Sequence, residues 1–305
     1  MKDFAGRTAF VTGGAHGVGI GIARNLLNQG CKVAIADIRQ DSIDAALASL
    51  DNREVMGVQL DVMDRAGFTA AADKVEAEFG PVSLLFNNAG INLFQTIEDS
   101  SYDDWDWVLG VNLGGVINGV MTFAPRMKTR ALSGELTGGH IVNTASMASF
   151  IAGGAPGIYN TAKIAVRGLS YSLRHSMYQY GIGVSVVHPG LVKSYIYASD
   201  DVRPDGLKAA MRPVDAAAVE RLAGIHEFGM EPDTIGARIL EGIRENRANI
   251  FTHPDHKDEL RELFDEVLAD YRDYPQDAGY DQRVAFEKMR RDNFSETRRK
   301  AKAIG

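Results

Sequence analysis

A serine, a tyrosine and a lysine stand at spacings that suit proton transfer. Tyr159 follows Ser146 by thirteen positions, and Lys163 comes four positions later. Residues four apart lie one turn apart on one helix face, so a tyrosine and a lysine at this spacing can meet. A nearby ammonium favours the phenolate, and tyrosine otherwise titrates near ~10, so the pair forms a tunable acid and base. The alternative is an ordinary surface pair, with Ser146 acting as a helix cap.

The surrounding residues indicate how this set would be held. An apolar run at 139–145 predicts a strand that ends at Ser146, and glycines and a proline within 153–157 predict a loop. From Ile158 onward, apolar residues recur at three-and-four spacing, which predicts a helix to about Tyr180. Ser146 would then face that helix from the end of a strand.

A glycine-rich loop lies between the first predicted strand, 8–13, and a helical pattern that begins near Ile20. Strand, glycine loop and helix in this order are typical of nucleotide binding. Glycines let the backbone approach a pyrophosphate, and the helix N-terminus offers free N–H groups and a favourable dipole. No Gly-Lys-Ser/Thr follows, so the loop is not a Walker loop. The candidate cofactor residues here are Gly13, His16, Gly17, Val18 and Gly19.

Two acidic residues follow the next two predicted strands. Asp37 ends the second strand, where a carboxylate can accept both hydroxyls of an adenosine ribose but repels a 2′-phosphate. We therefore expect NAD rather than NADP, although His16 or Arg39 could contact a phosphate. Asp61, followed by Val62, could contact the adenine or could cap the next helix.

Amide and small residues come next. Asn88, Ala89 and Gly90 leave the fourth predicted strand, and such residues suit either close approach to a cofactor or a tight turn. A long helix predicted at about 102–127 carries Asn112 among apolar neighbours, and a polar amide there must find a partner. Asn112 is either a satisfied core asparagine or one that bends the helix and holds a water.

Composition bounds the remaining possibilities. The chain has 305 residues, of which 45% are hydrophobic and 24% charged, which suits a globular protein with a full core. A net charge of −7 argues against nucleic acid or an anionic membrane as the main partner. Cys31 is the only cysteine, and the two histidines and one acid at His253, Asp255 and His256 have no evident further ligand group, so we expect no metal site. No signal peptide or run of ~18 apolar residues stands out, which favours a cytoplasmic protein.

Two segments lie outside the alternation of strands and helices that the rest of the sequence predicts. Prolines and glycines break up residues 194–233, and such an insertion can cover a pocket as a lid. An apolar stripe from Leu260 to Tyr271, and a second helix near 282–298, predict a helical C-terminal extension over 255–305. Because the stripe must be buried, we expect it to pack on its own domain or on a neighbouring subunit of a dimer or tetramer.

The motifs together resemble those of the short-chain dehydrogenase/reductase family. In chain order they are Thr12-Gly13-x-x-x-Gly17-x-Gly19, Asp61, Asn87-Asn88-Ala89-Gly90, Asn112, Ser146, Tyr159-x-x-x-Lys163 and Pro189-Gly190. The match covers about residues 6–254, so we assign residues 1–254 to a nucleotide-binding and catalytic domain. The resemblance implies an α/β, Rossmann-type, doubly wound seven-stranded parallel sheet with helices on both faces. Ligands would lie at the carboxyl ends of the strands.

The resemblance also implies a reaction, namely hydride transfer between a nicotinamide and the carbinol carbon of a small-molecule substrate. Tyr159 would be the general acid or base, and Lys163 would lower its pKa and hold the nicotinamide ribose. Ser146 would position the substrate oxygen, and Asn112 would anchor a water that links Lys163 to solvent. The family usually has threonine where Ser194 stands, but the hydroxyl is kept. The cofactor residues implied after the sixth strand are Pro189, Gly190, Val192 and Ser194.

A narrower resemblance concerns the substrate. Residues 102–112 and 225–232 resemble segments of the Cα-dehydrogenases that oxidise benzylic alcohols of lignin-derived β-aryl ethers. In this fold, side chains after the fourth, fifth and sixth strands lie beside the nicotinamide, and here several are aromatic. Such a wall favours a bulky, flat, largely uncharged group. With Ser146 and Tyr159, the candidate substrate-binding residues are Asn92, Phe94, Phe150 and Tyr195.

These arguments predict NAD-dependent oxidation of a bulky benzylic secondary alcohol to a ketone. One alternative is an NADPH-dependent carbonyl reductase, against which Asp37 argues. Another is a non-catalytic dinucleotide-binding protein, which would be expected to have lost part of the Ser146, Tyr159 and Lys163 set.

Overall fold

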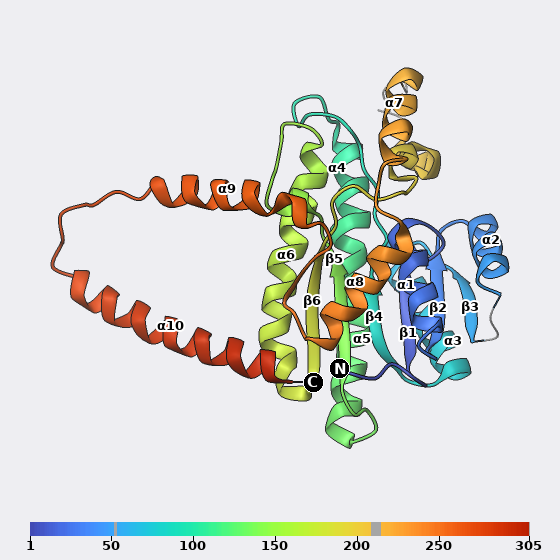
Figure 1. Cartoon of the computed structure of the whole chain (residues 1–305), viewed down its shortest axis with the longest axis horizontal. Helices are drawn as coiled ribbons and strands as arrows, with labels where there is room; N and C mark the ends of the chain where they lie inside the picture. The colour runs from blue at the N-terminus through green and yellow to red at the C-terminus, as the bar shows by residue number, and fades with distance from the viewer. Residues whose placement is uncertain (52–53, 209–214, 305) are drawn as a thin grey trace.

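The computed structural model describes residues 1–51, 54–208 and 215–304. Within them, seven parallel strands form one sheet in the order β3-β2-β1-β4-β5-β6-β7 (Figure 1). This confirms the predicted doubly wound parallel sheet. The strands are β1 (Thr8–Thr12), β2 (Lys32–Asp37), β3 (Val55–Gln59), β4 (Val82–Asn87), β5 (Gly139–Thr144), β6 (Ile182–His188) and β7 (Asn249–Phe251).

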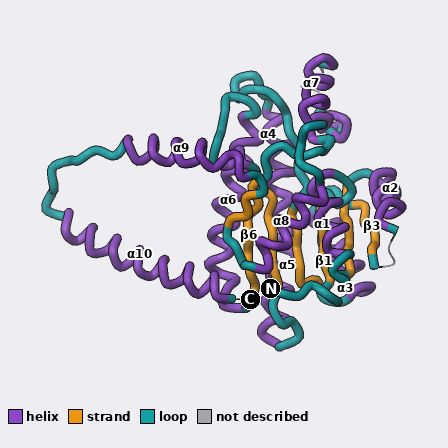
Figure 2. The backbone as a smooth tube through the Cα atoms, viewed as in Figure 1, coloured by secondary structure: helices purple, strands orange, loops and turns teal. Residues whose placement is uncertain are grey.

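Helices cover both faces of this sheet (Figure 2). Every residue of β1, β4, β5 and β6 is buried, which explains why these strands are apolar runs rather than alternating patterns. The helices packed on one face are α1 (Gly17–Leu27), α2 (Gln40–Leu50) and α8 (Pro232–Arg244). Those on the other face are α3 (Arg65–Phe79), α5 (Gly115–Ser133) and α6 (Gly157–Met177).

The strand order reverses between β1 and β4, because β1 lies between β2 on one side and β4 on the other. In open parallel sheets, a crevice forms outside the carboxyl ends of the strands at such a reversal. The glycine-rich loop after β1 and the Asn88-Ala89-Gly90 segment after β4 both lie at this point.

The long helix predicted at about 102–127 is interrupted. It consists of α4 (Tyr102–Leu109), one turn of π-helix η1 (Gly110–Gly114) and α5. Asn112 lies in the π-turn and is fully buried. The whole stretch is long and apolar enough to meet the criteria for a membrane span, but half of its most apolar window is buried inside the protein, as in a core helix.

The insertion has two parts. Its first part forms two short 3₁₀ turns, η4 (Ile196–Val202) and η5 (Asp205–Leu207), and its second part forms α7 (Ala216–His226), which has no buried residue. Residues 209–214 of the insertion lie outside the described residues. Other short turns are η2 (Met147–Ser149), η3 (Tyr178–Tyr180) and η6 (Pro254–His256).

The C-terminal extension forms α9 (Lys257–Ala269) and α10 (Tyr280–Ala303), which project from the body as an arm (Figure 1). Phe264 contacts the body through the Phe150 ring, 6.0 Å away between centroids. The rest of the predicted stripe is largely uncovered, with Leu268 64% exposed and Tyr271 80% exposed. The expectation that the stripe packs on its own domain therefore holds only near its first turns.

Candidate active site

A cavity of about 1010 Å³ opens at the carboxyl ends of the strands. Ligand sites are usually clefts of this size, with a few polar groups among apolar walls. Most residues predicted from the sequence line it. They are Gly13, His16, Gly17, Val18, Asp37, Asp61, Val62, Asn88, Ala89, Gly90, Asn92, Phe94, Ser146, Tyr159, Lys163, Pro189, Gly190, Val192, Ser194 and Tyr195. Gly19, Asn112 and Phe150 lie outside the lining.

Tyr159 and Lys163 share one face of α6, as the spacing predicted, and both line the cavity. The Lys163 Nζ atom lies 5.4 Å from the centre of the Tyr159 ring and donates a hydrogen bond of 3.0 Å to the Thr144 carbonyl oxygen. Lys163 is only 3% exposed, and this burial lowers its pKa to about 8. Burial raises the pKa of Tyr159, and a hydrogen bond with the Ser146 side chain opposes that rise.

The Ser146 side chain caps a short turn and also lines the cavity. Its Oγ atom accepts a hydrogen bond of 3.2 Å from the Ala148 N–H, so it caps the short turn η2. The same hydroxyl faces Tyr159 in the cavity, and it lies 3.5 Å from the Pro189 carbonyl oxygen. The cap fixes the hydroxyl at the end of β5, opposite the α6 pair.

Asn112 is a satisfied core asparagine. Its Oδ1 atom accepts from the Ile91 N–H, and its Nδ2 atom donates to the Ile91 carbonyl oxygen, both at 2.9 Å. A Cβ added at Gly90 would lie 3.2 Å from Asn112 Oδ1 and 3.3 Å from Lys163 Nζ, so the two side chains converge behind this glycine. The π-turn therefore fixes the segment after β4 next to Lys163, and a water at Asn112 stays a prediction.

The glycine-rich loop borders the cavity and packs closely on neighbouring segments. Gly13 and Gly17 have positive φ angles of 60° and 48°, and a Cβ on either would lie within 3.0 Å of a neighbouring segment. His16 makes no side-chain cap, so the first N–H groups of α1 are free to face an anion. A Cβ added at Gly19 would lie 1.9 Å from the Gly13 carbonyl oxygen. Glycine at this position therefore allows α1 to pack closely on the loop.

Asp37 lies at the tip of β2 and lines the cavity. Its carboxylate accepts hydrogen bonds from the Ile38 N–H at 2.9 Å and the Ala15 N–H at 3.3 Å, which orients it beside the glycine-rich loop. Arg39 forms an ion pair of 2.7 Å with Asp41. One of the two residues that could contact a 2′-phosphate is therefore held by a neighbouring carboxylate.

Hydrogen bonds join the strand tips beneath the cavity. The Thr12 hydroxyl accepts from the N–H groups of Asn88 and Ala89, at 2.9 and 3.1 Å. The Asn88 side chain donates to the Gly13 carbonyl oxygen at 3.2 Å and accepts from the Thr144 hydroxyl at 3.2 Å. Asn88 thus connects β1, β4 and β5 instead of only forming a tight turn.

Asp61 does not cap the next helix, because Asp64 does so. Asp64 accepts from the Ala66 N–H at 3.0 Å and caps α3, whereas Asp61 accepts from the Met63 N–H at 2.9 Å within the preceding turn. Asp61 also lines the cavity, as a residue near an adenine would.

The cavity wall predicted to contact the substrate differs in part from the prediction. Asn92, Phe94 and Tyr195 line it, but Phe150 does not, because its ring packs between His188 and Phe264 at centroid distances of 4.9 and 6.0 Å. Residues that sequence reasoning missed as lining include Trp107 of α4, Val202 of η4 and His226 of α7. Only the fold brings these three segments together.

The histidines near the site are occupied with structural contacts. His188 is fully buried between the Ser149 hydroxyl and the Asn249 side chain, and burial lowers its pKa to about 4. This agrees with a neutral core histidine at a strand end. His253 accepts from the Gly190 N–H at 2.9 Å, and its other ring nitrogen lies 2.9 Å from the Leu191 carbonyl oxygen.

Two curated relatives are similar over much of the chain. The C alpha-dehydrogenase of Sphingobium sp. (strain NBRC 103272 / SYK-6) is 39% identical over 271 residues, which are 88% of this chain and 87% of the relative. The NADP-dependent (R)-specific alcohol dehydrogenase of Lentilactobacillus kefiri is 38% identical over 192 residues, which are 62% of this chain and 74% of the relative.

Solved structures are similar over nearly the whole chain. A short-chain dehydrogenase structure from Novosphingobium aromaticivorans has a TM-score of 0.88 at 64% identity, covering 99% of this chain and 100% of that one. A short chain dehydrogenase/reductase from Burkholderia phymatum in complex with NAD has a TM-score of 0.82 at 34% identity, covering 91% and 100%. The family model for short chain dehydrogenases matches residues 7–203. The chain belongs to the short-chain dehydrogenase/reductase family, whose members are oxidoreductases that bind a nicotinamide dinucleotide.

Proposed function

We propose that the protein oxidises a bulky aromatic secondary alcohol to a ketone with NAD. The observation that carries the proposal is the convergence of Ser146, Tyr159 and Lys163 on the cavity that also contains the glycine-rich loop and Asp37. A non-catalytic dinucleotide-binding protein has no need to keep a buried lysine beside a tyrosine at this place, since burying an ammonium is costly.

In the proposed reaction, a bound nicotinamide would accept the hydride that leaves the carbinol carbon. The Tyr159 oxygen takes the hydroxyl proton, and the carbon–oxygen single bond becomes a carbonyl once the carbon has also lost its hydride. The Ser146 hydroxyl donates to the same substrate oxygen and stabilises its negative charge. Lys163, held by the Thr144 carbonyl, favours the phenolate electrostatically when it is protonated.

The groups of the site that face the cavity fit NAD. The uncapped start of α1 and the close-approach glycines can hold a pyrophosphate, and the Asp37 carboxylate can accept ribose hydroxyls. Arg39 is paired with Asp41, which weakens the case for a 2′-phosphate. The family uses both cofactors, since one relative is NADP-dependent and one related structure contains NAD.

The substrate assignment depends on the wall formed by Phe94, Trp107, Tyr195, Ile196 and Val202. Burial of aryl groups against such side chains contributes more than hydrogen bonds to a polyol would. Similarity to a C alpha-dehydrogenase supports a benzylic carbinol, with lignin-type aryl ethers as the first choice.

Purified protein should reduce NAD with 1-arylpropane-type alcohols at a higher kcat/KM than with sugars, steroids or short aliphatic alcohols. The expected preference follows from the aromatic wall, and the measurement is absorbance of reduced cofactor across the panel with NAD and NADP in parallel. Turnover restricted to carbonyl reduction with NADPH would instead support the alternative reductase, and clear preference for a sugar would remove the aryl assignment.

Alcohol oxidation should accelerate as pH rises from neutral to alkaline, and ketone reduction should slow. Burial raises the pKa of Tyr159, so its basic form is scarce at neutral pH in the protein alone. Oxidation needs that basic form, whereas reduction needs the phenol. Profiles of kcat/KM in both directions test the signs, and they report Tyr159 and Lys163 as a coupled pair. An oxidation rate that falls with rising pH would contradict the assignment of the base.

We also propose that the protein is a homo-oligomer assembled through the C-terminal arm. Both ends of the arm are fixed to the body: Phe264 packs on Phe150, and Asn246 and Arg174 donate to the Ala301 carbonyl oxygen at 2.7 and 3.2 Å. The part between is exposed, and its uncovered apolar side chains include Val267, Leu268, Tyr271, Val284, Phe286 and Met289.

Charge distribution on the arm favours a second copy as the partner. The α9 helix carries five acidic and two basic side chains, whereas α10 carries four acidic and eight basic ones. A twofold axis would place the acidic α9 of each copy beside the basic α10 of the other. The apolar side chains between them would then be covered.

Charge reversal tests this arrangement. Lys288→Glu/Arg291→Glu in α10 should dissociate the oligomer, as should Glu262→Lys/Glu266→Lys in α9, because each places like charges together. A mixture of the two variants should reassemble, since acidic and basic helices again face each other. The measurement is mass by analytical ultracentrifugation, with Arg65→Glu/Lys74→Glu on α3 as the control. A wild-type monomer, or reversal without effect, would contradict the arm contact.

A further inference from the structure

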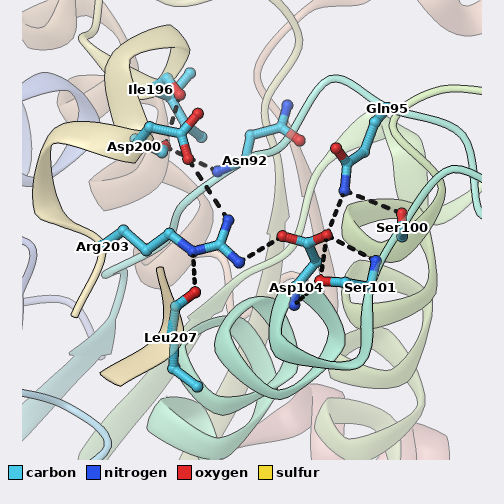
Figure 3. Close-up of polar contacts among 10 residues, drawn as sticks. Asn92, Gln95, Ser100, Ser101, Asp104, Ile196, Asp200, Arg203 and Leu207 are labelled. Atoms are coloured by element: carbon cyan, nitrogen blue, oxygen red, sulfur yellow. Dashed lines mark hydrogen bonds and ion pairs between the residues drawn. The ribbon is translucent and has the colours of Figure 1, made fainter. Parts of the chain in front are cut away.

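A buried ion pair joins the insertion to α4. The Arg203 Nη2 and Asp104 Oδ1 atoms are 2.6 Å apart, and the two side chains are 1% and 5% exposed (Figure 3). Neither residue lines the cavity. Because removing two charges from water is costly unless they are well paired, the arrangement needs an explanation beyond local helix stability.

Asp104 does more than cap α4. Its Oδ2 atom accepts from the Ser101 N–H at 2.8 Å and completes a capping box, and it also accepts from Gln95 Nε2 at 2.9 Å (Figure 3). The other oxygen is left for Arg203. Burial alone would raise the pKa of Asp104, but the hydrogen bonds from Ser101, Arg203 and Gln95 hold it below its usual value, so the group stays charged.

Arg203 is fixed on several sides. Its Nε atom donates to the Leu207 carbonyl oxygen at 2.7 Å, which links the residue after η4 to the last residue of η5. Its guanidinium lies 5.0 Å from the centre of the Trp107 ring, and the Asp200 carboxylate is 3.8 Å away. Trp107 in turn lines the cavity. The ion pair therefore lies directly behind the cavity wall.

A second contact holds the same segment. The Ser199 hydroxyl accepts from the Asn92 N–H at 2.9 Å and donates to the Ile196 carbonyl oxygen at 2.7 Å. Residues 196–207, which we call the outer wall, are thus attached to the segment after β4 through Ser199 and to α4 through Arg203. The cavity-lining side chains of the outer wall are Ile196, Ala198, Ser199, Asp201 and Val202.

We propose that Asp104 and Arg203 are positioning residues: their ion pair fixes the outer wall in place and so determines the affinity for alcohols bulky enough to reach it. The choice of substrate rests on the proposed function, whereas the contacts do not. In this view, the first part of the insertion is a fixed outer wall rather than part of a lid. The later α7 has no buried residue.

Arg203→Met tests the proposal, because methionine keeps an apolar stem over Trp107 but loses the charge and the donors. KM for a bulky aryl carbinol should rise about 10-fold or more, while kcat changes less. KM for NAD and for 2-propanol, which is too small to reach the outer wall, should stay within about 2-fold. Arg203→Lys should restore part of the affinity, because it keeps the charge.

Two further measurements separate positioning from general destabilisation. Arg130→Met removes a partner of Glu76, in an ion pair that lies outside the cavity lining. It should leave the KM values for the aryl carbinol and for 2-propanol unchanged. Amide hydrogen exchange of 196–207 should accelerate in Arg203→Met and in the milder Asp104→Asn, but not in Arg130→Met. The proposal would be overturned if Arg203→Met folds and its ratio of KM for the aryl carbinol to KM for 2-propanol equals that of the wild type. Unchanged amide exchange in 196–207 would also overturn it. If no aryl alcohol is a substrate, the proposed function fails while the exchange measurement still tests the ion pair.

Discussion

Tyr159→Phe should lower kcat for alcohol oxidation by about 10²- to 10⁴-fold, the usual contribution of a positioned acid or base. The phenyl ring keeps the packing of α6 in place, and the variant loses the hydroxyl that faces Ser146. NAD affinity should change little, because the glycine-rich loop and Asp37 lie on other elements. The measurements are steady-state turnover of an aryl carbinol and calorimetric titration with NAD.

A second tyrosine on the same helix provides a matched control. The Tyr171 hydroxyl donates to Asn249 Oδ1 at 2.7 Å and lies outside the cavity lining. Tyr171→Phe should lower the free energy of unfolding by about 1 kcal/mol, because a hydrogen bond is lost, but leave kcat near the wild-type value. Near-normal kcat in Tyr159→Phe would refute the mechanism, and equal losses in both variants would point to a damaged helix.

The sheet was predictable because its strands are short runs bounded by turn residues, and four of them, β1, β4, β5 and β6, are apolar runs buried throughout. The first strand, predicted at 8–13, spans Thr8–Thr12, and the strand predicted at 139–145 spans Gly139–Thr144. The spacing of Tyr159 and Lys163 was equally informative, because helix geometry alone brings them together. Such local rules explain why most of the residues predicted to bind the cofactor line the cavity.

The substrate side depends on packing between segments that are remote in sequence. Phe150 follows the fifth strand as a cavity residue would, yet its ring turns towards His188 and Phe264. The π-turn at Asn112 has no period that a helical pattern reveals, since it adds one residue to a single turn. The ion pair of Asp104 and Arg203 joins residues 99 positions apart, and each charge by itself resembles a solvated surface residue.

The choice between cofactors illustrates a similar limit. Asp37 was predictable from its place at a strand end, but the sequence also offered Arg39 as a phosphate contact. In the structure, the Arg39 side chain is paired with Asp41, which only side-chain geometry could show. This pairing supports the proposed preference for NAD, which depends mainly on the Asp37 carboxylate at the tip of β2.

Asp37→Ala should reduce kcat/KM with NAD by about 10- to 100-fold and raise it with NADP, so that the preference narrows or reverses. The carboxylate accepts ribose hydroxyls and repels a 2′-phosphate, and each tenfold change corresponds to about 1.4 kcal/mol, the scale of one charged hydrogen bond. The measurement is kcat/KM with each cofactor at a saturating concentration of one alcohol.

Two neighbouring carboxylates separate this effect from a general change in charge. Asp41→Ala should free Arg39, so kcat/KM with NADP rises while that with NAD stays near the wild-type value. Asp44→Ala should change neither, because Asp44 is exposed on α2, bonds Gln40 and lies outside the cavity lining. A wild-type preference for NADP would show that His16 or Arg39 dominates over Asp37. An equal loss with both cofactors in Asp37→Ala would mean that this carboxylate acts mainly by orienting the loop through the Ala15 and Ile38 N–H groups.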